Sequence, residues 1–418
     1  MSLEFTKIIN DIQNMGRYLA YRDREALIDK ALAILNDKGA DLDFVKNRVR
    51  MVRESDVSGY RGAAPPPDAV AQPLNAVIPP PGGQARSTLI AVDGSQVYPN
   101  FESSSLYYVL NIGVLVYRHG TDEMPHQETL PGIFYTDGYI LDETRQVISN
   151  RTVNSRRTVA EIRMLWHQAR HLSREPAPRI AMHDGNLLKF FGGSDITDGS
   201  SLINEYMGLL VALQDAQTTL TGYVDNPRSS YLISLLHLLD LEPEHISDAM
   251  LRTNGEIEGL SDADVMARLL SPGERSVLMV QNSPANYEYK KFNPSHEIAV
   301  VYINTSDTKT PHIARLDVPM WVALDNDALD ELHRVVLEQC RMQGMRPYPY
   351  GLTRADELAY ISGREREQVE SLVRRELIRN NSVQQSNGSA KANSKVFGRD
   401  SHKQGHRLGG FPLDRSSN

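Results

Sequence analysis

The stretch Ser87-Thr-Leu-Ile-Ala-Val-Asp93-Gly-Ser95 is a short apolar run that ends in an acid, a glycine and a small polar residue. Such runs, bounded by glycine turns, are typical of buried β-strands. A second stretch, Arg179-Ile-Ala-Met-His-Asp184-Gly-Asn186, has the same form. An acid at the end of a buried strand lies on a rigid edge that faces solvent, where a divalent metal can reach it. The two aspartates therefore indicate metal-dependent phosphodiester chemistry.

The order of elements around these two strands predicts the fold class. Residues 89–92, 106–116 and 132–141 are predicted strands with short connections, which favours an antiparallel meander. Asp137-Gly138 is a hairpin signal within the third of them. A helix over 154–172 and a strand over 180–183 follow. Acids at the ends of the first and fourth strands fit an α/β fold with a ribonuclease-H-like mixed sheet and flanking helices.

Changes in composition divide the chain into four segments. Residues 1–58 form a helical N-terminal extension, with apolar residues at helical spacing. Residues 59–86 are rich in proline and glycine, which predicts a linker. The predicted nuclease domain covers 87–379, and 380–418 has too few apolar residues to fold alone, so we expect a disordered tail.

Charge and cysteine content limit the class of protein. The 418-residue chain has a formal net charge of -8, which argues against a protein that simply coats nucleic acid. A nuclease stays possible, because metal-binding acids lower the net charge and a local basic channel is invisible in a sum. The one cysteine, Cys340, cannot form an internal disulfide, and no run has the ~20 apolar residues of a membrane span. We expect a cytoplasmic protein without a membrane segment, with Cys340 packed inside a helix.

Hydrolysis of a phosphodiester needs neutralised charge on the phosphate and an activated water, and two divalent ions provide both. Mg²⁺ and Mn²⁺ prefer carboxylate oxygens. Asp93 and Asp184 are the first candidates, although an Asp-Gly turn that caps backbone amides explains each of them too. Glu161 is either a further ligand or half of a surface ion pair with Arg157. Asp356 is a fourth candidate, or an acid in the first turn of a helix.

Three further residues are candidates for substrate binding. Ser95 can contact a phosphate or cap the Asp93 turn, and Tyr223 can reach the same sheet edge. Lys189 can bind phosphate, although a role as an ordinary surface residue explains it equally well.

The chain resembles the NurA nuclease family. The matching motifs are Ala91-Val-Asp-Gly-Ser95, Arg156-Arg-Thr-Val-Ala-Glu161, His183-Asp-Gly-Asn-Leu187 and Pro347-Tyr-Pro-Tyr-Gly-Leu-Thr-Arg-Ala-Asp-Glu-Leu-Ala-Tyr-Ile361. Their order and spacing carry the resemblance over roughly residues 87 to 379. Two positions depart from the family pattern: Asn186 stands where serine is common, and Asp356 stands where some relatives carry a histidine.

The resemblance implies a ribonuclease-H-like core and DNA cleavage that depends on Mn²⁺, with Mg²⁺ as the alternative ion, and with Asp93, Glu161 and Asp184 as the metal ligands. It also implies 5′→3′ exonuclease and single-strand endonuclease activities. Further implications are a homodimer with a central DNA channel and a hexameric HerA-type ATPase as partner in DNA end resection and recombination repair.

Two other functions fit the residues. A non-catalytic DNA clamp or ATPase adaptor would have the same fold, but a degenerate subunit is free to lose Asp93 and Asp184, and both are present. A phosphomonoesterase with Asp93 as nucleophile is weakened because Ser95 stands where a second aspartate is needed.

Overall fold

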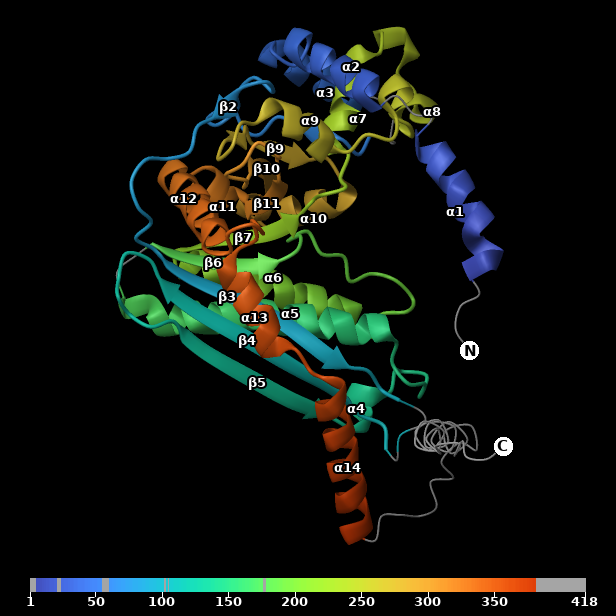
Figure 1. Ribbon diagram of the computed structural model, residues 1–418, viewed down its shortest axis with the longest axis vertical. Helices are drawn as coiled ribbons and strands as arrows, with labels where there is room; N and C mark the ends of the chain where they lie inside the picture. Colours follow the sequence, from blue (N-terminus) through green and yellow to red (C-terminus); the bar gives the residue numbers. More distant parts are fainter. Residues whose placement is uncertain are drawn as a thin grey trace, which may run out of the picture.

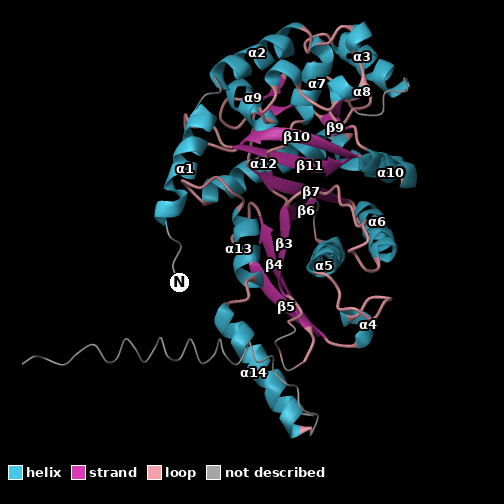
Figure 2. Ribbon diagram, turned by 90° about the vertical axis from the view of Figure 1, so that its right-hand side faces the viewer, coloured by secondary structure: helices cyan, strands magenta, loops and turns pink. Residues whose placement is uncertain are grey.

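A computed structural model describes residues 5–20, 24–54, 60–100, 103, 105–175 and 178–380, with the backbone alone for 17–20. Its centre is one mixed β-sheet with helices on both faces, and a helical cap lies at one end (Figures 1 and 2). The predicted disordered tail falls on 381–418, outside the described residues. No helix among the residues described is long and apolar enough to cross a membrane.

Five neighbouring strands form the ribonuclease-H-like part of the sheet, in the order β5-β4-β3-β6-β7. The first three are an antiparallel meander, as predicted, although the third strand covers 126–134 and not 132–141. β3, β6 and β7 run parallel to one another. This mixed sheet with flanking helices confirms the predicted fold class. Their bounds are β3 (Thr88–Val97), β4 (Tyr108–Arg118), β5 (His126–Phe134), β6 (Arg179–Asp184) and β7 (Thr218–Asp225).

The sheet continues beyond β7 through antiparallel strands. β11 pairs with β7, β10 with β11, and short strands complete the far edge. These strands are β1 (Ala63–Ala64), β2 (Val77–Ile78), β8 (Arg275–Ser276), β9 (Met279–Gln281), β10 (Ile298–Asn304) and β11 (Ile313–Pro319).

Side chains of β3 alternate between two cores, because successive residues of a strand point to opposite faces. Ile90 and Val92 pack with α5 (Asn150–His171) and α6 (Gly199–Asp215). Leu89 and Ala91 pack on the opposite face, against the following two helices and Cys340, which is buried as predicted. These helices are α12 (Asn326–Met342) and α13 (Tyr350–Ala359). Figure 2 shows α5 and α6 on one side of the sheet and α13 on the other.

A third core lies in the helical cap, where the second and third helices of the chain pack against two later ones. The cap helices are α2 (Arg24–Asp37), α3 (Leu42–Glu54), α7 (Tyr231–Asp240) and α9 (Asp262–Leu269). The other helices are α1 (Phe5–Ala20), α4 (Asp137–Ile140), α8 (Asp248–Leu251), α10 (Pro284–Phe292), α11 (Met320–Ala323) and α14 (Gly363–Arg379).

Two local predictions were wrong. Asp137-Gly138 does not form a hairpin; it begins the short helix α4, where an acid in the first turn is favourable. The proline-rich segment is not a free linker, because β1 pairs with β9 and β2 pairs with β8. Strands of two residues are too short to show a periodic pattern in the sequence. Their partners also lie about 200 residues away, so no local signal marks the pairing.

Gly113 of β4 determines how closely α13 approaches the sheet. A Cβ atom at this position would collide with the carbonyl oxygen of Ala355 and the amide nitrogen of Ala359, both in the α13 backbone. A helix backbone cannot move aside as a flexible side chain can. Glycine is therefore needed for α13, and for Asp356 on it, to lie where they do.

We expect Gly113→Val to displace α13 and to lower the free energy of unfolding by about 1–3 kcal/mol, as overpacking does. Thermal denaturation measures the effect. Gly208→Ala in α6 is the matched control: a Cβ there meets open space, and alanine in a helix is more favourable than glycine by about 0.5–1 kcal/mol. Equal melting temperatures for the Gly113 variant and the wild type would contradict this account of α13 packing.

Candidate active site

Parallel pairing of β3 with β6 brings Asp93, inside β3, next to Asp184, at the end of β6. Val92 lies opposite His183 in the register, so the next residues, Asp93 and Asp184, are neighbours on adjacent strands. Paired strands lie about 4.8 Å apart and paired side chains share a face. Asp93 is half-buried and Asp184 is exposed. Asp184 ends β6 as predicted, but the prediction that Asp93 ends its strand is wrong: β3 continues to Val97, and Asp93-Gly94 pairs with β4 in place of forming a turn.

Asp356 reaches the same place from α13. Together with Asp93, Asp184 and Arg157 it lines an open cavity of about 430 Å³. Because α13 begins at Tyr350, Asp356 lies in the last turn of the helix and not in the first. An acid near a helix C-terminus is opposed by the helix dipole. Capping therefore does not explain this residue, whereas a role in the cavity does.

Glu161 of α5 lies beneath the cavity on the other face of the sheet. It is 2% exposed and does not line the cavity. Its Oε1 lies 3.0 Å from Arg157 Nε, and its Oε2 lies 3.7 Å from His183 Nδ1. The ion pair expected from the sequence is thus present, but it is buried and not on the surface. A Cβ atom at Gly94 would stand 2.6 Å from Glu161 Oε1, so glycine there lets the carboxylate approach β3.

Burial and mutual repulsion raise the pKa values of these acids. Loss of water raises the pKa of Asp93 to about 6, and the carboxylates of Asp184 and Asp356 add to the rise. Burial raises the pKa of Glu161 to about 8, although Arg157 opposes the shift. The pKa of Asp184 is also raised, chiefly because its carboxyl group loses water, although the residue as a whole is exposed. Like charges gathered in this way are typical of sites that a cation neutralises.

The donor set fits a hard divalent cation in chemistry, and two of its three members, Asp93 and Asp184, line the same cavity. Carboxylate oxygens are what Mn²⁺ and Mg²⁺ prefer, and Asp93, Asp184 and Glu161 come together from three elements. Glu161 Oε1 is buried and accepts no hydrogen bond from a described residue, so the ion pair with Arg157 is what compensates its charge in the absence of a cation. Nevertheless, no three His, Cys, Asp or Glu residues within the described part of the chain form a ready-made metal site. Glu161 would have to turn from Arg157 to join the aspartates.

The three predicted substrate-binding residues lie in different surroundings. Ser95 lines the cavity, and its hydroxyl donates to the Ala359 carbonyl oxygen at 2.5 Å. Tyr223 is fully buried with its hydroxyl against the Pro347 carbonyl, which gives it a supporting position and no place on the cavity wall. The half-buried Lys189 lies within electrostatic reach of Glu161 and Asp184.

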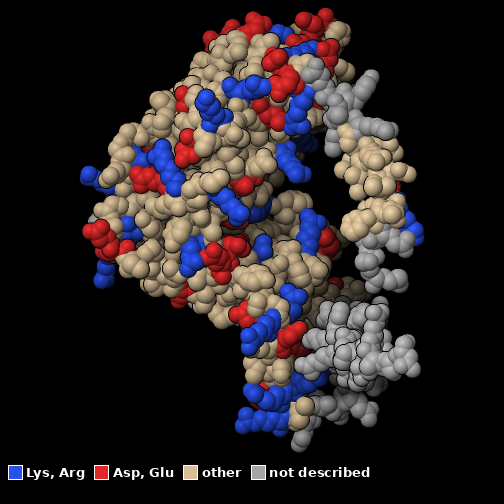
Figure 3. Space-filling model, in the orientation of Figure 1, with Lys and Arg blue, Asp and Glu red and all other residues tan. Residues whose placement is uncertain are grey.

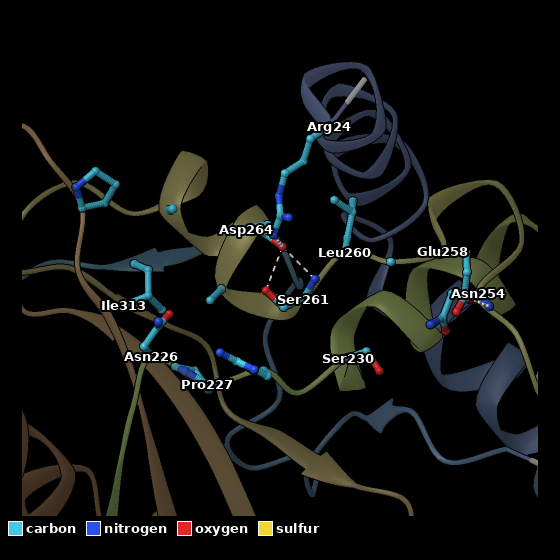
Figure 4. Close-up of a pocket in the computed structure, with 15 residues that line it drawn as sticks. Arg24, Asn226, Pro227, Ser230, Asn254, Glu258, Leu260, Ser261, Asp264 and Ile313 are labelled. Carbon is cyan, nitrogen blue, oxygen red and sulfur yellow. Dashed lines mark hydrogen bonds and ion pairs between the residues drawn. The ribbon is translucent and has the colours of Figure 1, made fainter. Parts of the chain in front are cut away.

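A second polar cavity, of about 540 Å³, lies in the helical cap (Figure 4). Arg24 of α2 crosses one side of it and forms an ion pair with Asp264 of α9, 2.7 Å away. Asp264 also accepts hydrogen bonds from Ser261, so its charge serves to hold the cap together. None of the acids predicted for catalysis lines this cavity.

Comparison with known families decides the identity of the core. The model of the NurA domain matches residues 87–361. The chain belongs to the NurA family. The match begins at the strand that carries Asp93 and ends just after α13, so it includes every acid of the cavity.

Three solved structures are similar in shape. The NurA nuclease from Sulfolobus solfataricus has 13% identity and a TM-score of 0.49, with 90% of this chain and 96% of that chain covered. Drosophila Piwi has 11% identity and a TM-score of 0.28, covering 65% and 29%. The RNase H1 called LC9 has 9% identity and a TM-score of 0.21, covering 38% and 72%. Comparison with curated proteins gives no match.

The NurA motif near the C-terminus contains a site residue that the sequence did not single out. The hydroxyl of Tyr348 hydrogen-bonds the Asp184 carboxylate, and its ring packs edge-on against Tyr223, with centroids 5.3 Å apart. Burial and Asp184 raise the pKa of Tyr348, so it stays a donor. Arg366, at the start of α14, was also missed; it lines the same cavity as Asp93, Asp184 and Asp356. Proximity of Tyr348 to the aspartates depends on long-range folding and leaves no local signal.

The raised pKa values give an expectation for stability without added metal. Asp93 and Glu161 hold protons in the folded state that they lose in the unfolded state, so they lower stability as pH rises from about 4 to about 8. In EDTA at pH 8, Asp93→Asn should therefore melt about 2–4 °C above the wild type, with the difference vanishing near pH 4. Mn²⁺ should raise the melting temperature of the wild type more than that of the variant.

Asp122→Asn, in an exposed loop, is the control and should behave as the wild type at both pH values. An Asp93→Asn variant that melts at or below the wild-type temperature at pH 8 would show that the cavity does not hold excess negative charge.

Proposed function

We propose that this protein is a nuclease that hydrolyses DNA with the help of divalent cations, Mn²⁺ or Mg²⁺. One observation carries the proposal: in a NurA family member, Asp93 and Asp184 meet on adjacent parallel strands, and helices from both faces bring Asp356 and Glu161 toward them. Acids clustered in this way do not stabilise the fold, because each carboxylate opposes the ionisation of the others.

Asp93, Asp184 and Glu161 would hold the cations, with Asp356 as a further candidate. Bound there, the cations would neutralise the scissile phosphate and lower the pKa of the attacking water. The hydroxyl of Tyr348 interacts with the Asp184 carboxylate and opposes the rise in the pKa of that acid. Arg157 balances the charge of Glu161 in the absence of cations and lines the cavity where a phosphate would lie.

Local charge supports a nucleic-acid substrate in spite of the net charge of -8. Acidic side chains gather over the helical cap in Figure 3, whereas α14 at the opposite end carries five arginines beside four glutamates. Arg366 links this helix to the acid cavity. Arg364, Arg375 and Arg379 share another face of α14 and are exposed. Phosphate contacts by such arginines supply affinity that does not depend on sequence.

Replacement of the paired acids of β3 and β6 tests the proposal directly. We expect Asp93→Ala and Asp184→Ala each to lower Mn²⁺-dependent cleavage of labelled DNA about a thousandfold, since a metal ion contributes several kcal/mol and about 1.4 kcal/mol is tenfold. Glu161→Gln should be nearly as damaging. Well-folded variants that cleave as fast as the wild type would remove these acids from the active site.

Arg157→Ala is the informative partner of Glu161→Gln. The two changes break the same ion pair, 3.0 Å long, but Arg157→Ala leaves the carboxylate in place. We expect Arg157→Ala to keep more activity than Glu161→Gln. Equal activities would mean that Glu161 serves the ion pair alone.

The finer proposals come from the family. They are 5′→3′ exonuclease and single-strand endonuclease activities, a homodimer, and a hexameric HerA-type ATPase as partner in DNA end resection and recombination repair. An acidic protein holds long DNA poorly by itself, because phosphate neutralisation supplies most non-specific affinity. A ring-shaped partner that threads DNA would raise its local concentration.

Addition of such an ATPase with ATP should therefore stimulate cleavage of long duplex DNA severalfold or more, and cleavage of short single strands less. Light scattering measures the oligomeric state, and paired nuclease assays measure the stimulation. A monomer that degrades long duplex equally well with and without the ATPase would refute the assembly.

A further inference from the structure

Gln96 of β3 lines the acid cavity and joins the strand to α5. It lies three residues after Asp93 and is half-buried. Its amide makes two hydrogen bonds, each 2.8 Å long: Oε1 accepts from Nη1 of Arg157, and Nε2 donates to the hydroxyl of Tyr98. Gln96 therefore contacts the cation that pairs with Glu161, and it does so at the wall of the cavity that contains the aspartates.

The arginine fixes the direction of this hydrogen-bond chain. A guanidinium only donates hydrogen bonds, so the oxygen of the Gln96 amide has to face Arg157 and its NH₂ group has to face Tyr98. The Tyr98 hydroxyl then donates onward to Oδ1 of Asn154, at 2.8 Å. Asn154 lies on α5 about one turn before Arg157, so the chain leaves the helix and returns to it. A chain with one possible direction holds the Gln96 side chain in a single orientation.

Protein groups hold two of the nitrogens of the Arg157 guanidinium. Nη1 donates to Gln96, and Nε lies 3.0 Å from Oε1 of Glu161. Nη2 forms no hydrogen bond with any described residue. Because the guanidinium is planar, the two held nitrogens also fix the position of Nη2. Arg157 lines the cavity, so Nη2 is a donor that a phosphate oxygen can use.

The hydrogen bond to Gln96 matters most when Glu161 binds cations. Glu161 has to turn from Arg157 to join the aspartates, and the ion pair at Nε is then lost. Gln96 is the hydrogen-bond partner that the guanidinium keeps among the described residues. A neutral amide holds the guanidinium without cancelling its charge, whereas a carboxylate at this position would neutralise the cation that attracts a phosphate.

We propose that Gln96 is a positioning residue, which holds the Arg157 guanidinium at the acid cavity so that Nη2 binds a phosphate of the DNA strand. The inference rests on the proposed function and deepens it, because it names the pair of side chains that recognises the phosphate beside the cations. Arg157 then has two uses: it is the counter-ion of Glu161 when no cation is bound, and it is a phosphate ligand when Glu161 has turned to the cations.

A double-mutant cycle separates this role from a purely structural tie between β3 and α5. Its members are the wild type, Gln96→Met, Arg157→Ala and the double variant. Gln146→Met is the control, because Gln146 is exposed and lies outside the cavity. Affinity for a fluorescent oligonucleotide is measured by anisotropy with Ca²⁺, which also prefers carboxylate oxygens, in place of Mn²⁺. A gel confirms that the oligonucleotide stays intact.

Arg157→Ala should weaken binding about tenfold and Gln96→Met about fivefold, since a hydrogen bond to a charged group is lost. In the Arg157→Ala background, Gln96→Met should have less than about a twofold effect, because the guanidinium that it positions is gone. Gln146→Met should bind as the wild type does.

Cleavage with Mn²⁺ provides a second readout. Loss of a phosphate contact that forms before the reaction should raise KM more than it lowers kcat, in Gln96→Met as in Arg157→Ala. Tyr98→Phe removes the hydroxyl that orients Gln96 and keeps the ring, so it should shift KM in the same direction by a smaller factor.

Equal losses of affinity from Gln96→Met in the wild-type and Arg157→Ala backgrounds would overturn the inference. Wild-type affinity of Gln96→Met would overturn it as well. If Gln96→Met does not fold, Tyr98→Phe in both backgrounds decides the question in the same way. Failure of the wild type to cleave DNA with Mn²⁺ refutes the proposed function, whereas the binding cycle decides the role of Gln96 separately.

Discussion

The register between β3 and β6 is the constraint on which the site depends. A shift of this parallel pairing by one residue would turn every side chain of one strand to the other face. Asp93 and Asp184 would then no longer be neighbours, and Leu89 and Ala91 would leave the core that holds α12 and α13. Because both faces of β3 are buried, the hydrophobic cores that stabilise the sheet also set the position of the acids. Stability and the candidate active site therefore rest on the same pairing.

Repulsion among the acids destabilises the arrangement that the β3–β6 pairing imposes. Each carboxylate raises the pKa of its neighbours, and Glu161 is buried with Arg157 as its counter-ion. A buried ion pair of this kind contributes little net stability, because desolvation offsets the attraction. Its use lies elsewhere: Arg157 also donates to Gln96 on β3 at 2.8 Å, so the arginine ties the helix to the strand beside the cavity. The fold tolerates the acids since rigid elements on both faces hold them.

Helices and strands that depend on interactions between neighbouring residues could be predicted from the sequence. The strands around Asp93 and Asp184 and the helix with Glu161 follow from apolar periodicity and glycine turns, and the structure contains all three. Features that depend on distant partners were not predictable in this way. Tyr348 meets Asp184 from more than 160 residues away, and β1 and β2 are too short for any pattern. Asp356 was placed in a first helical turn because the start of α13 at Tyr350 lacks a capping side chain. Its approach to the acids depends on Gly113, in a different strand.

The two-residue strands β1 and β2 have a consequence for the boundaries of the folding unit. They cover parts of β9 and β8 that would otherwise present unpaired backbone amides and carbonyls. An uncovered sheet edge is a template for pairing with other chains. The limits of the family match, residues 87 and 361, therefore leave out two strands of this sheet. The segment before residue 87 pairs with one end of the sheet and joins the sheet to the helical cap. A chain cut at the family boundary would expose the backbone amides and carbonyls that β1 and β2 now pair with, and this exposed edge would favour self-association.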